Sequence, residues 1–168
     1  MKGIFCMFLF VAAFVSCCRK QTAAVLPVCN INQTYASNAA RATVTNGIWG
    51  TIASMEGNCM PVVNPMTCKT CPVQRKVRIY AYTQYSQATP QGANSFYDSF
   101  GTQLVKEVDA DADGFYQADL APGQYTIVVI ENGKLYAFGF DGNAGISPFT
   151  VTGGKQNLNL TMTYKATF

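Results

Sequence analysis

The feature that most limits the fold of this chain is a two-residue alternation of apolar and polar side chains, which begins near Thr43 and continues almost to the C-terminus. In segment 76–83, Val77, Ile79 and Ala81 alternate with basic and aromatic residues. Successive side chains of a strand point to opposite faces, so this period predicts half-buried β-strands. Seven or eight segments have this character, with candidates at 43–52, 76–83, 103–109, 114–120, 123–131, 134–141, 146–152 and 156–164.

Turn signals separate these segments. Asn132-Gly133 lies between two of them, and both residues tolerate positive φ, which is typical of a two-residue hairpin. Short strands joined by tight turns pack as antiparallel sheets, and the chain length suits one domain. We therefore predict an all-β fold for residues 42–168, an antiparallel β-sandwich of seven or eight strands with no helix of three turns.

Histidine is absent, and charged residues make up only 12% of the chain. The missing histidine excludes Ser-His-Asp and Cys-His catalysis and His-ligated zinc or iron. The net charge of +3 comes without a cluster of lysine and arginine that could follow a phosphate backbone, so no nucleic-acid partner is expected. We predict a protein that is not an enzyme, has no catalytic residues and uses no cofactor.

The N-terminus has the pattern of an export signal. A short basic start is followed by an apolar run, 3–15, which is too short to span a bilayer. The next residues, Val15-Ser16-Cys17, resemble the lipobox of bacterial lipoproteins, in which a small residue precedes the acylated cysteine. We predict a signal peptide over 1–16 and lipidation at Cys17. With Cys17 as the acylated residue, Phe14 stands where lipoboxes usually have Leu or Val. Cys18 is the alternative, because it places the branched residue Val15 at that position.

The residues after the cysteine predict where the domain lies. No aspartate follows Cys17 or Cys18, which by analogy with Gram-negative sorting favours the outer membrane. We expect a cell-envelope lipoprotein held at the outer membrane by its N-terminal lipid, on the periplasmic or the surface side. Segment 17–41 is rich in Ala, Gln, Asn, Thr and Ser without an apolar period, so we predict a flexible tether.

Four cysteines follow Cys17 and Cys18: Cys29, Cys59, Cys68 and Cys71. Disulfides are the default outside the cytoplasm, so all four are candidate disulfide residues. Cys59 is expected to pair with Cys68 or with Cys71, which leaves the other for Cys29. A redox or zinc role for Cys68-Lys69-Thr70-Cys71 is the alternative, but the sequence around it predicts neither a helix start nor histidine ligands.

Two turn motifs point to a family. Asp111-Ala112-Asp113-Gly114-Phe115-Tyr116 and Leu120-Ala121-Pro122-Gly123-Gln124-Tyr125 resemble the turns of the carboxypeptidase regulatory-like (transthyretin-like) domain, although Ala121 stands where that family usually has proline. Gly47-Ile48-Trp49-Gly50 resembles its first strand. The resemblance covers 47–168 and implies a transthyretin-like sandwich, as found in small exported bacterial members. It also implies a domain that accompanies other activities without performing chemistry.

Two groups of residues are candidate sites. Asp109, Asp111 and Asp113 have the spacing that begins a calcium loop, but Leu120 stands where the closing glutamate would be needed, so they are a weak metal candidate and a turn is expected. The second group is an aromatic loop, 85–101, which carries the candidate binding residues Tyr85, Phe96, Tyr97 and Phe100.

These observations predict a non-catalytic envelope lipoprotein whose sandwich is a structural, protein-interaction or ligand-binding module. The alternative is a surface adhesin or carbohydrate-binding protein that uses loop 85–101. The expected partners are the membrane, through the lipid, and an envelope protein or a glycan.

The lipid anchor gives the first testable prediction. Mass spectrometry of the mature protein from its host is expected to find an acylated cysteine at position 17 or 18 as the N-terminal residue. Replacing Cys17 with serine moves or abolishes the modification, and the same change at Cys18 identifies the site. An unmodified N-terminus at either cysteine contradicts the prediction.

Overall fold

The computed structural model describes residues 29–61, 67–92 and 95–168. The predicted signal peptide, 1–16, and the predicted lipidation sites Cys17 and Cys18 lie outside these residues. In chain order the elements are α1 (Ile31–Ala39), β1 (Gly47–Asn58), β2 (Lys69–Pro72), β3 (Lys76–Ala81), the 3-10 turn η1 (Tyr85–Gln87), β4 (Ala88–Pro90), β5 (Phe96–Phe100), β6 (Leu104–Asp109), β7 (Phe115–Asp119), β8 (Gly123–Glu131), β9 (Lys134–Tyr136), β10 (Pro148–Val151), β11 (Lys155–Asn157) and β12 (Leu160–Thr167).

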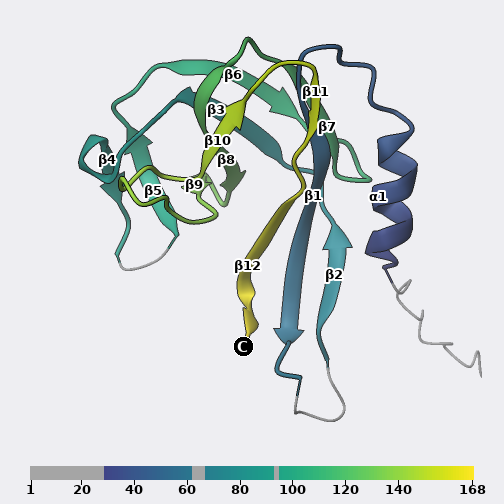
Figure 1. Cartoon of the computed structure of the whole chain (residues 1–168). Helices are drawn as coiled ribbons and strands as arrows, with labels where there is room; N and C mark the ends of the chain where they lie inside the picture. The colour runs from purple at the N-terminus through teal and green to yellow at the C-terminus, as the bar shows by residue number, and fades with distance from the viewer. Residues whose placement is uncertain (1–28, 62–66, 93–94) are drawn as a thin grey trace, which may run out of the picture.

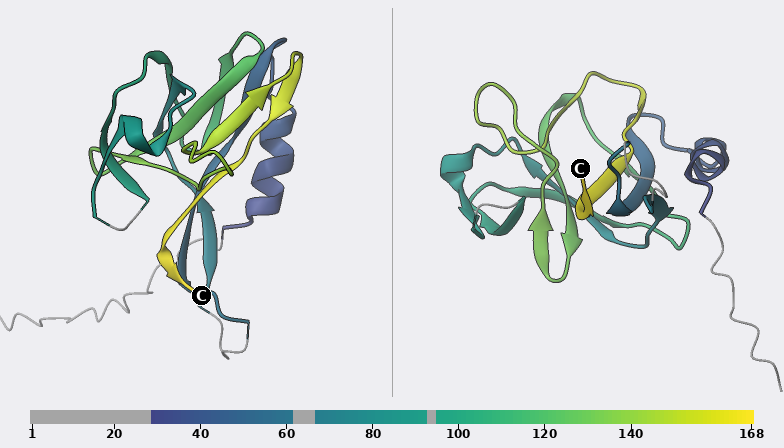
Figure 2. Two further views of the ribbon diagram at one scale, coloured as in Figure 1. Left: turned by 60° about the vertical axis from the view of Figure 1, so that its left-hand side comes forward. Right: turned by 90° about the horizontal axis from the view of Figure 1, so that it is seen from below.

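The long strand β1 is the centre of a five-stranded sheet (Figure 1). Its first half pairs antiparallel with β7 and parallel with β11, and its second half pairs antiparallel with β2 and parallel with β12. Twelve residues give β1 room for these two sets of neighbours in succession. The second half, with β2 and β12, extends beyond the other sheet as an arm (Figures 1 and 2).

The second sheet has seven strands in the order β4-β5-β9-β8-β3-β6, with β10 also paired to β8. β10 pairs with the first residues of β8 and β9 with the last ones, while β3 covers the opposite edge. β9 and β10 therefore follow one another along one edge of β8. Segment 137–147, which connects them, fills the interval.

The two sheets confirm the predicted all-β sandwich, with two differences. The described residues form twelve strands, because short β2, β4 and β5 lack the alternation that marks the others and because the predicted strand 156–164 is divided in two. In addition, β11 and β12 run parallel to β1 rather than antiparallel. The hairpin at Asn132-Gly133 is confirmed, since both residues have positive φ, 52° and 76°.

The predicted strand 156–164 is divided into β11 and β12 where the chain passes Gly50. The carbonyl oxygen of Leu158 lies 1.9 Å from the position that a Cβ on Gly50 would occupy, so only glycine permits this approach. The Thr51 N–H donates to Oδ1 of Asn159 at 2.9 Å, and the Leu158 N–H donates to the carbonyl of Trp49. The chain thus shifts from one half of β1 to the other without leaving it.

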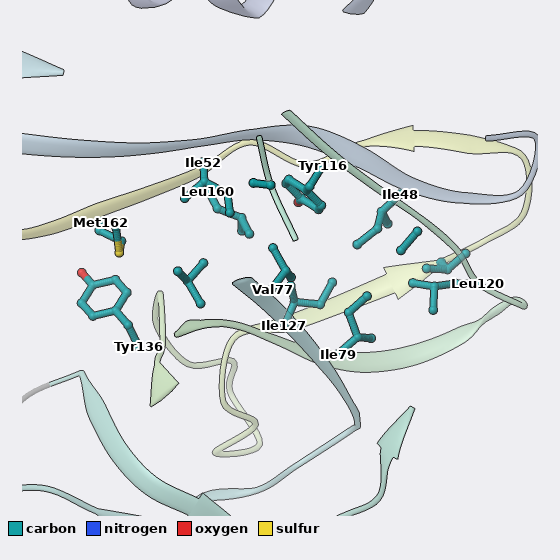
Figure 3. Close-up of a cluster of buried hydrophobic side chains, with 14 residues drawn as sticks. Ile48, Ile52, Val77, Ile79, Tyr116, Leu120, Ile127, Tyr136, Leu160 and Met162 are labelled. Carbon is teal, nitrogen blue, oxygen red and sulfur yellow. The ribbon is translucent and has the colours of Figure 1, made fainter. Parts of the chain in front are cut away.

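The main core lies between the two sheets (Figure 3). Ile48 and Ile52 of β1 face Val77 and Ile79 of β3, and all four are fully buried. Tyr116 of β7 is buried among them and donates its hydroxyl to the carbonyl of Leu158 at 2.6 Å. Burial raises the pKa of Tyr116, so the hydroxyl stays protonated and the bond is kept.

The structure corrects the predicted tether for residues 29–41. Helix α1 begins after Asn30, whose side chain accepts from the Gln33 N–H, and it lies against the outer face of the five-stranded sheet (Figures 1 and 2). Asn38 is buried and donates to Thr51 Oγ1 and to the Asp113 carbonyl. These contacts are polar and reach residues distant in the chain, so no apolar period in the sequence indicated the helix. Residues 17–28 of the predicted tether lie outside the described residues.

Disulfides confirm the four candidate cysteines. Cys59 pairs with Cys68, one of the two expected partners, and Cys29 pairs with Cys71. The first bond closes the end of the arm, and the second fixes Cys29, two residues before α1, to β2. Within the described ranges, no helix has the length and apolarity needed to cross a membrane.

The two disulfides differ in the length of chain they close, which predicts unequal contributions to stability. The separations of 42 and 9 residues correspond to about 4 and about 2.5 kcal/mol of lost denatured-state entropy. Urea unfolding of the double serine variants Cys29→Ser/Cys71→Ser and Cys59→Ser/Cys68→Ser measures both. A larger loss for the second pair contradicts the expectation.

Candidate functional site

The three aspartates of the predicted cation candidate do not form a cation site: Asp109 ends β6, and Asp111 and Asp113 belong to the turn that follows it. Asp111 accepts from the backbone N–H groups of Asp113 and Phe115 and pairs with Arg41, whose guanidinium lies over the Phe115 ring. Burial raises the pKa of Asp111, but Arg41 and the backbone donors outweigh it and hold the pKa below its ordinary value. Across the described part of the chain, no three acidic or cysteine side chains gather to hold a metal ion.

The predicted aromatic loop is mostly strand and core. Phe96, Tyr97 and Phe100 lie on β5, where Tyr97 is only 2% exposed and Phe96 packs edge-on against Tyr136. The rings of Tyr97 and Phe100 are in edge contact with each other. They belong to a second core cluster, on the face of the seven-stranded sheet that points away from the main core. Tyr85 alone is exposed, at 48%, so the four residues do not form one binding surface.

The Cys68-x-x-Cys71 pair is not a dithiol, because its two cysteines belong to different disulfides. A redox motif needs its own two thiols to form and break one bond. The four candidate cysteines are therefore structural in this molecule.

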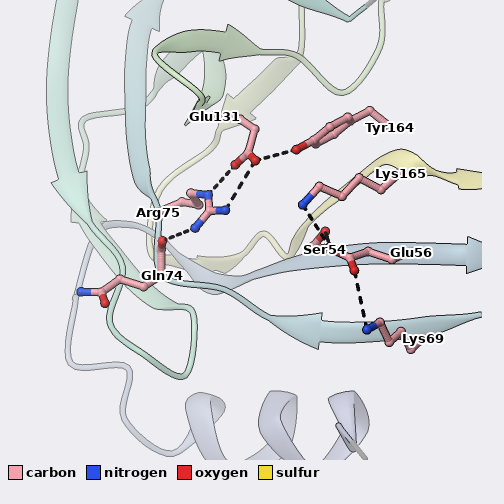
Figure 4. Close-up of polar contacts among 8 residues, drawn as sticks. All are labelled: Ser54, Glu56, Lys69, Gln74, Arg75, Glu131, Tyr164 and Lys165. Atoms are coloured by element: carbon pink, nitrogen blue, oxygen red, sulfur yellow. Dashed lines mark hydrogen bonds and ion pairs between the residues drawn. The ribbon is translucent and has the colours of Figure 1, made fainter. Parts of the chain in front are cut away.

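Glu131 is the one buried carboxylate in the described residues, at 2% exposure. It receives hydrogen bonds from Arg75 and from the hydroxyl of Tyr164, the latter at 2.6 Å (Figure 4). Glu131 ends β8 in one sheet and Tyr164 belongs to β12 in the other. We call these three residues the inter-sheet clasp, since they join the base of the arm to the second sheet.

The charges of the clasp compensate one another. Burial raises the pKa of Glu131, but the hydrogen bonds from Arg75 and Tyr164 outweigh it and hold the pKa below its ordinary value. Burial and the hydrogen bond to Glu131 raise the pKa of Tyr164. The carboxylate thus stays ionised and the phenol protonated, which suits an ion pair that stabilises the fold rather than an acid poised to exchange a proton.

Two adjoining cavities lie on the open side of the sandwich, between β12 and segment 137–147. Their volumes are about 260 and 390 Å³, and they share Phe138, Gly139, Leu158 and Leu160 in their linings. We call them together the β12 groove. The linings also include Ile127, Phe140, Phe149, Thr161 and Thr163.

Segment 137–147 is held in a strained conformation that forms one wall of the groove. Ala144 and Ser147 have positive φ, 59° and 40°, which costs non-glycine residues on the order of 1–3 kcal/mol each. Ser147 offsets this with three bonds: its Oγ accepts from the Phe138 N–H, its N–H donates to Gly139, and its carbonyl accepts from Ile127. The wall is therefore set by the fold before any ligand binds.

Asp141 stabilises the other end of the same segment. Its carboxylate accepts from the Gly145 and Asn143 N–H groups and from the hydroxyl of Tyr82, all at 2.8 Å. These bonds, that from Gly145 foremost, hold the pKa of Asp141 below its ordinary value. Phe140, beside it, is 57% exposed and lies 6.0 Å from the Tyr85 ring at the mouth of the groove.

The chemistry of the groove is that of binding. Neither lining contains a carboxylate, an amine or a thiol, and the polar groups present are hydroxyls and an amide. A mainly apolar concavity with a few polar groups is typical of a ligand site. Sequence reasoning missed it, because its walls come from segments far apart in the chain. The only local signal for the groove was the alternation of two phenylalanines, Phe138 and Phe140, just before the turn residues Asp141-Gly142-Asn143.

Comparisons with protein families, with curated proteins and with solved structures found no match to this chain. What the structure defines is therefore its class, a two-sheet β-sandwich with two disulfides. Disulfides of this kind fit a protein that folds outside the cytoplasm.

The clasp gives a pH-dependent prediction. The lowered pKa of Glu131 means that its contribution is complete above its ordinary pKa of 4.5 and is lost as the pH falls through the lowered value. Glu131→Gln is expected to lower the free energy of unfolding by about 1–3 kcal/mol at neutral pH. Urea unfolding of both proteins across the acid range tests this. A stability difference that does not shrink in acid contradicts the account.

Proposed function

We propose that this chain is a non-catalytic envelope lipoprotein whose sandwich binds a partner at the β12 groove. The observation that carries the proposal is the preformed, mainly apolar groove with no ionised group in its lining. A fixed apolar wall favours recognition, and the absence of an acid, base or thiol there offers no chemistry for turnover.

The lipid anchor, as proposed, keeps this groove near the membrane. Ten residues lie between Cys18 and Cys29, and eleven between Cys17 and Cys29. Even a fully extended chain of that length spans at most about 40 Å. Since Cys29 is bonded to Cys71 in β2, the domain is held within that reach of the bilayer. This geometry suits a partner in the same membrane or close beside it, and we place it at the outer membrane.

The absence of histidine and the state of Glu131 support a non-enzymatic role. The Glu131 carboxylate accepts hydrogen bonds from Arg75 and Tyr164, and it lines neither cavity of the groove. The turn motifs that resemble the carboxypeptidase regulatory-like domain are consistent with this role, because such domains commonly accompany an activity carried by another domain or chain. We propose membership of that family on those motifs alone.

Glycan binding is the second candidate, and one observation favours it. Tyr85 and Phe140 expose aromatic rings 6.0 Å apart at the mouth of the groove. Of the residues first expected to bind sugar, only Tyr85 keeps an accessible ring. Tyr85→Ala separates the candidates, since it removes glycan binding but leaves apolar contacts deeper in the groove intact.

Site-specific photo-cross-linking in the host tests the proposed function. A photoreactive residue at Phe140 is expected to give a discrete cross-linked envelope protein. The matched control is Leu104 on β6, an apolar side chain that is also exposed, at 44%. The same products from both positions, or none from Phe140, would contradict partner binding at the groove.

A further inference from the structure

The outer edge of β12 is open beside the groove. β12 ends its sheet and pairs with β1 alone among the described strands. An unpaired strand edge presents backbone N–H and C=O groups that can pair with another strand. The larger cavity lies along this edge, since Thr161 and Thr163 line it together with Tyr136 of β9 and Phe138 of segment 137–147.

The backbone of Thr161 faces this opening. The Thr163 N–H donates to the hydroxyl of Tyr136 at 3.1 Å, so Thr163 turns its backbone away from β1. Backbone groups along a strand alternate between its two edges, which gives Thr161 the same outward direction and leaves Leu160 and Met162 to bond β1. Tyr136 closes the groove at Thr163. The stretch of β12 on the N-terminal side of Thr163, which includes Thr161, is open.

Among the described strands, β7, β10 and β11 also pair with a single neighbour, but the stretch at Thr161 is the one that lies along the larger cavity. Native sheets guard their edges with charges, prolines, bulges or short strands. The β6 edge carries Lys106 and Glu107, and β2 and β4 are short strands that end in Pro72 and Pro90. On β12, Lys165 and the register shift opposite Ser54 and Glu56 guard only the outer half.

Apolar space lies beneath the unguarded stretch. Phe138, Leu158 and Leu160 line both cavities, and Ile127 and Phe149 add apolar surface to the smaller one. A strand laid along β12 would direct every second side chain into this space and the others to solvent. The lining has no ionised group, so the inward side chains must be uncharged, and Phe138, Leu158 and Leu160 favour apolar ones.

We propose that the groove takes an extended segment of a partner protein, with apolar side chains at alternate positions, as an added strand on β12. The inference rests on the proposed function and names the partner chemistry of the same site. Residues 136–139 line the side of the cavity opposite β12. From this wall we infer that the occupant is a single extended segment rather than the sheet edge of a second copy.

A proline at Thr161 tests strand addition. Thr161→Pro removes the outward N–H and puts a ring on the edge, while the bonds of Leu160 and Met162 to β1 remain. Thr161→Val keeps the N–H and is the matched control. The probe is a synthetic peptide library with leucine or valine at every second position. We expect a binding peptide whose affinity falls at least tenfold for Thr161→Pro and less than threefold for Thr161→Val.

A second measurement does not depend on how the proline variant folds. Backbone N-methylation of the bound peptide at the residues that face β12 is expected to abolish binding, and methylation of the alternate residues is expected to be tolerated. No binding peptide, equal losses for the two methylated sets, or unchanged affinity for folded Thr161→Pro would overturn the proposal. So would a dimer of the free protein that Thr161→Pro dissociates, because the occupant would then be a second copy.

The two proposals fail in different ways. If Phe140 cross-links a partner and Thr161→Pro leaves that product unchanged, strand addition is overturned and partner binding stands. If the photoreactive residue at Phe140 gives no cross-linked product, or only the products that the control at Leu104 also gives, the proposed function fails as well.

Discussion

The pairing of β1 with four strands is the constraint on which the rest of the structure depends. Its first half forms the sandwich with β7 and β11, and its second half carries β2 and β12 as an arm. Because the chain must shift from β11 to β12 along β1, it crosses at Gly50, where a side chain would collide with Leu158. This arrangement makes β12 the last strand of its sheet and leaves its edge beside the groove.

Strand periodicity allowed much of the sandwich to be predicted. β8 has the predicted bounds, 123–131, because Tyr125, Ile127 and Val129 alternate along it and turns enclose both of its ends. The sequence was less informative where long-range contacts decide the structure. Helix α1 is fixed by the Cys29–Cys71 bond and by buried Asn38, neither of which leaves an apolar period. Its strongest sequence trace was the cysteine itself.

The candidate site was harder to predict than the fold for a physical reason. The aromatic residues of 85–101 looked accessible, yet Tyr97 and Phe100 pack against each other and against Tyr80 as β5 folds over the sheet. The groove instead combines residues near 138 and near 160, which meet only after both sheets have formed. A surface made of neighbouring residues can be seen in a sequence, whereas one made by two sheets cannot.

Amide hydrogen exchange at Thr161 tests the central claim most directly. In the free protein its N–H faces the groove, so we expect fast exchange relative to Met162, which bonds β1. With the cross-linked partner or its binding segment present, the exchange at Thr161 is expected to slow at least tenfold while residues of β6 are unchanged. Unaltered exchange at Thr161 in the complex would contradict the account of β12 as the edge that receives a partner strand.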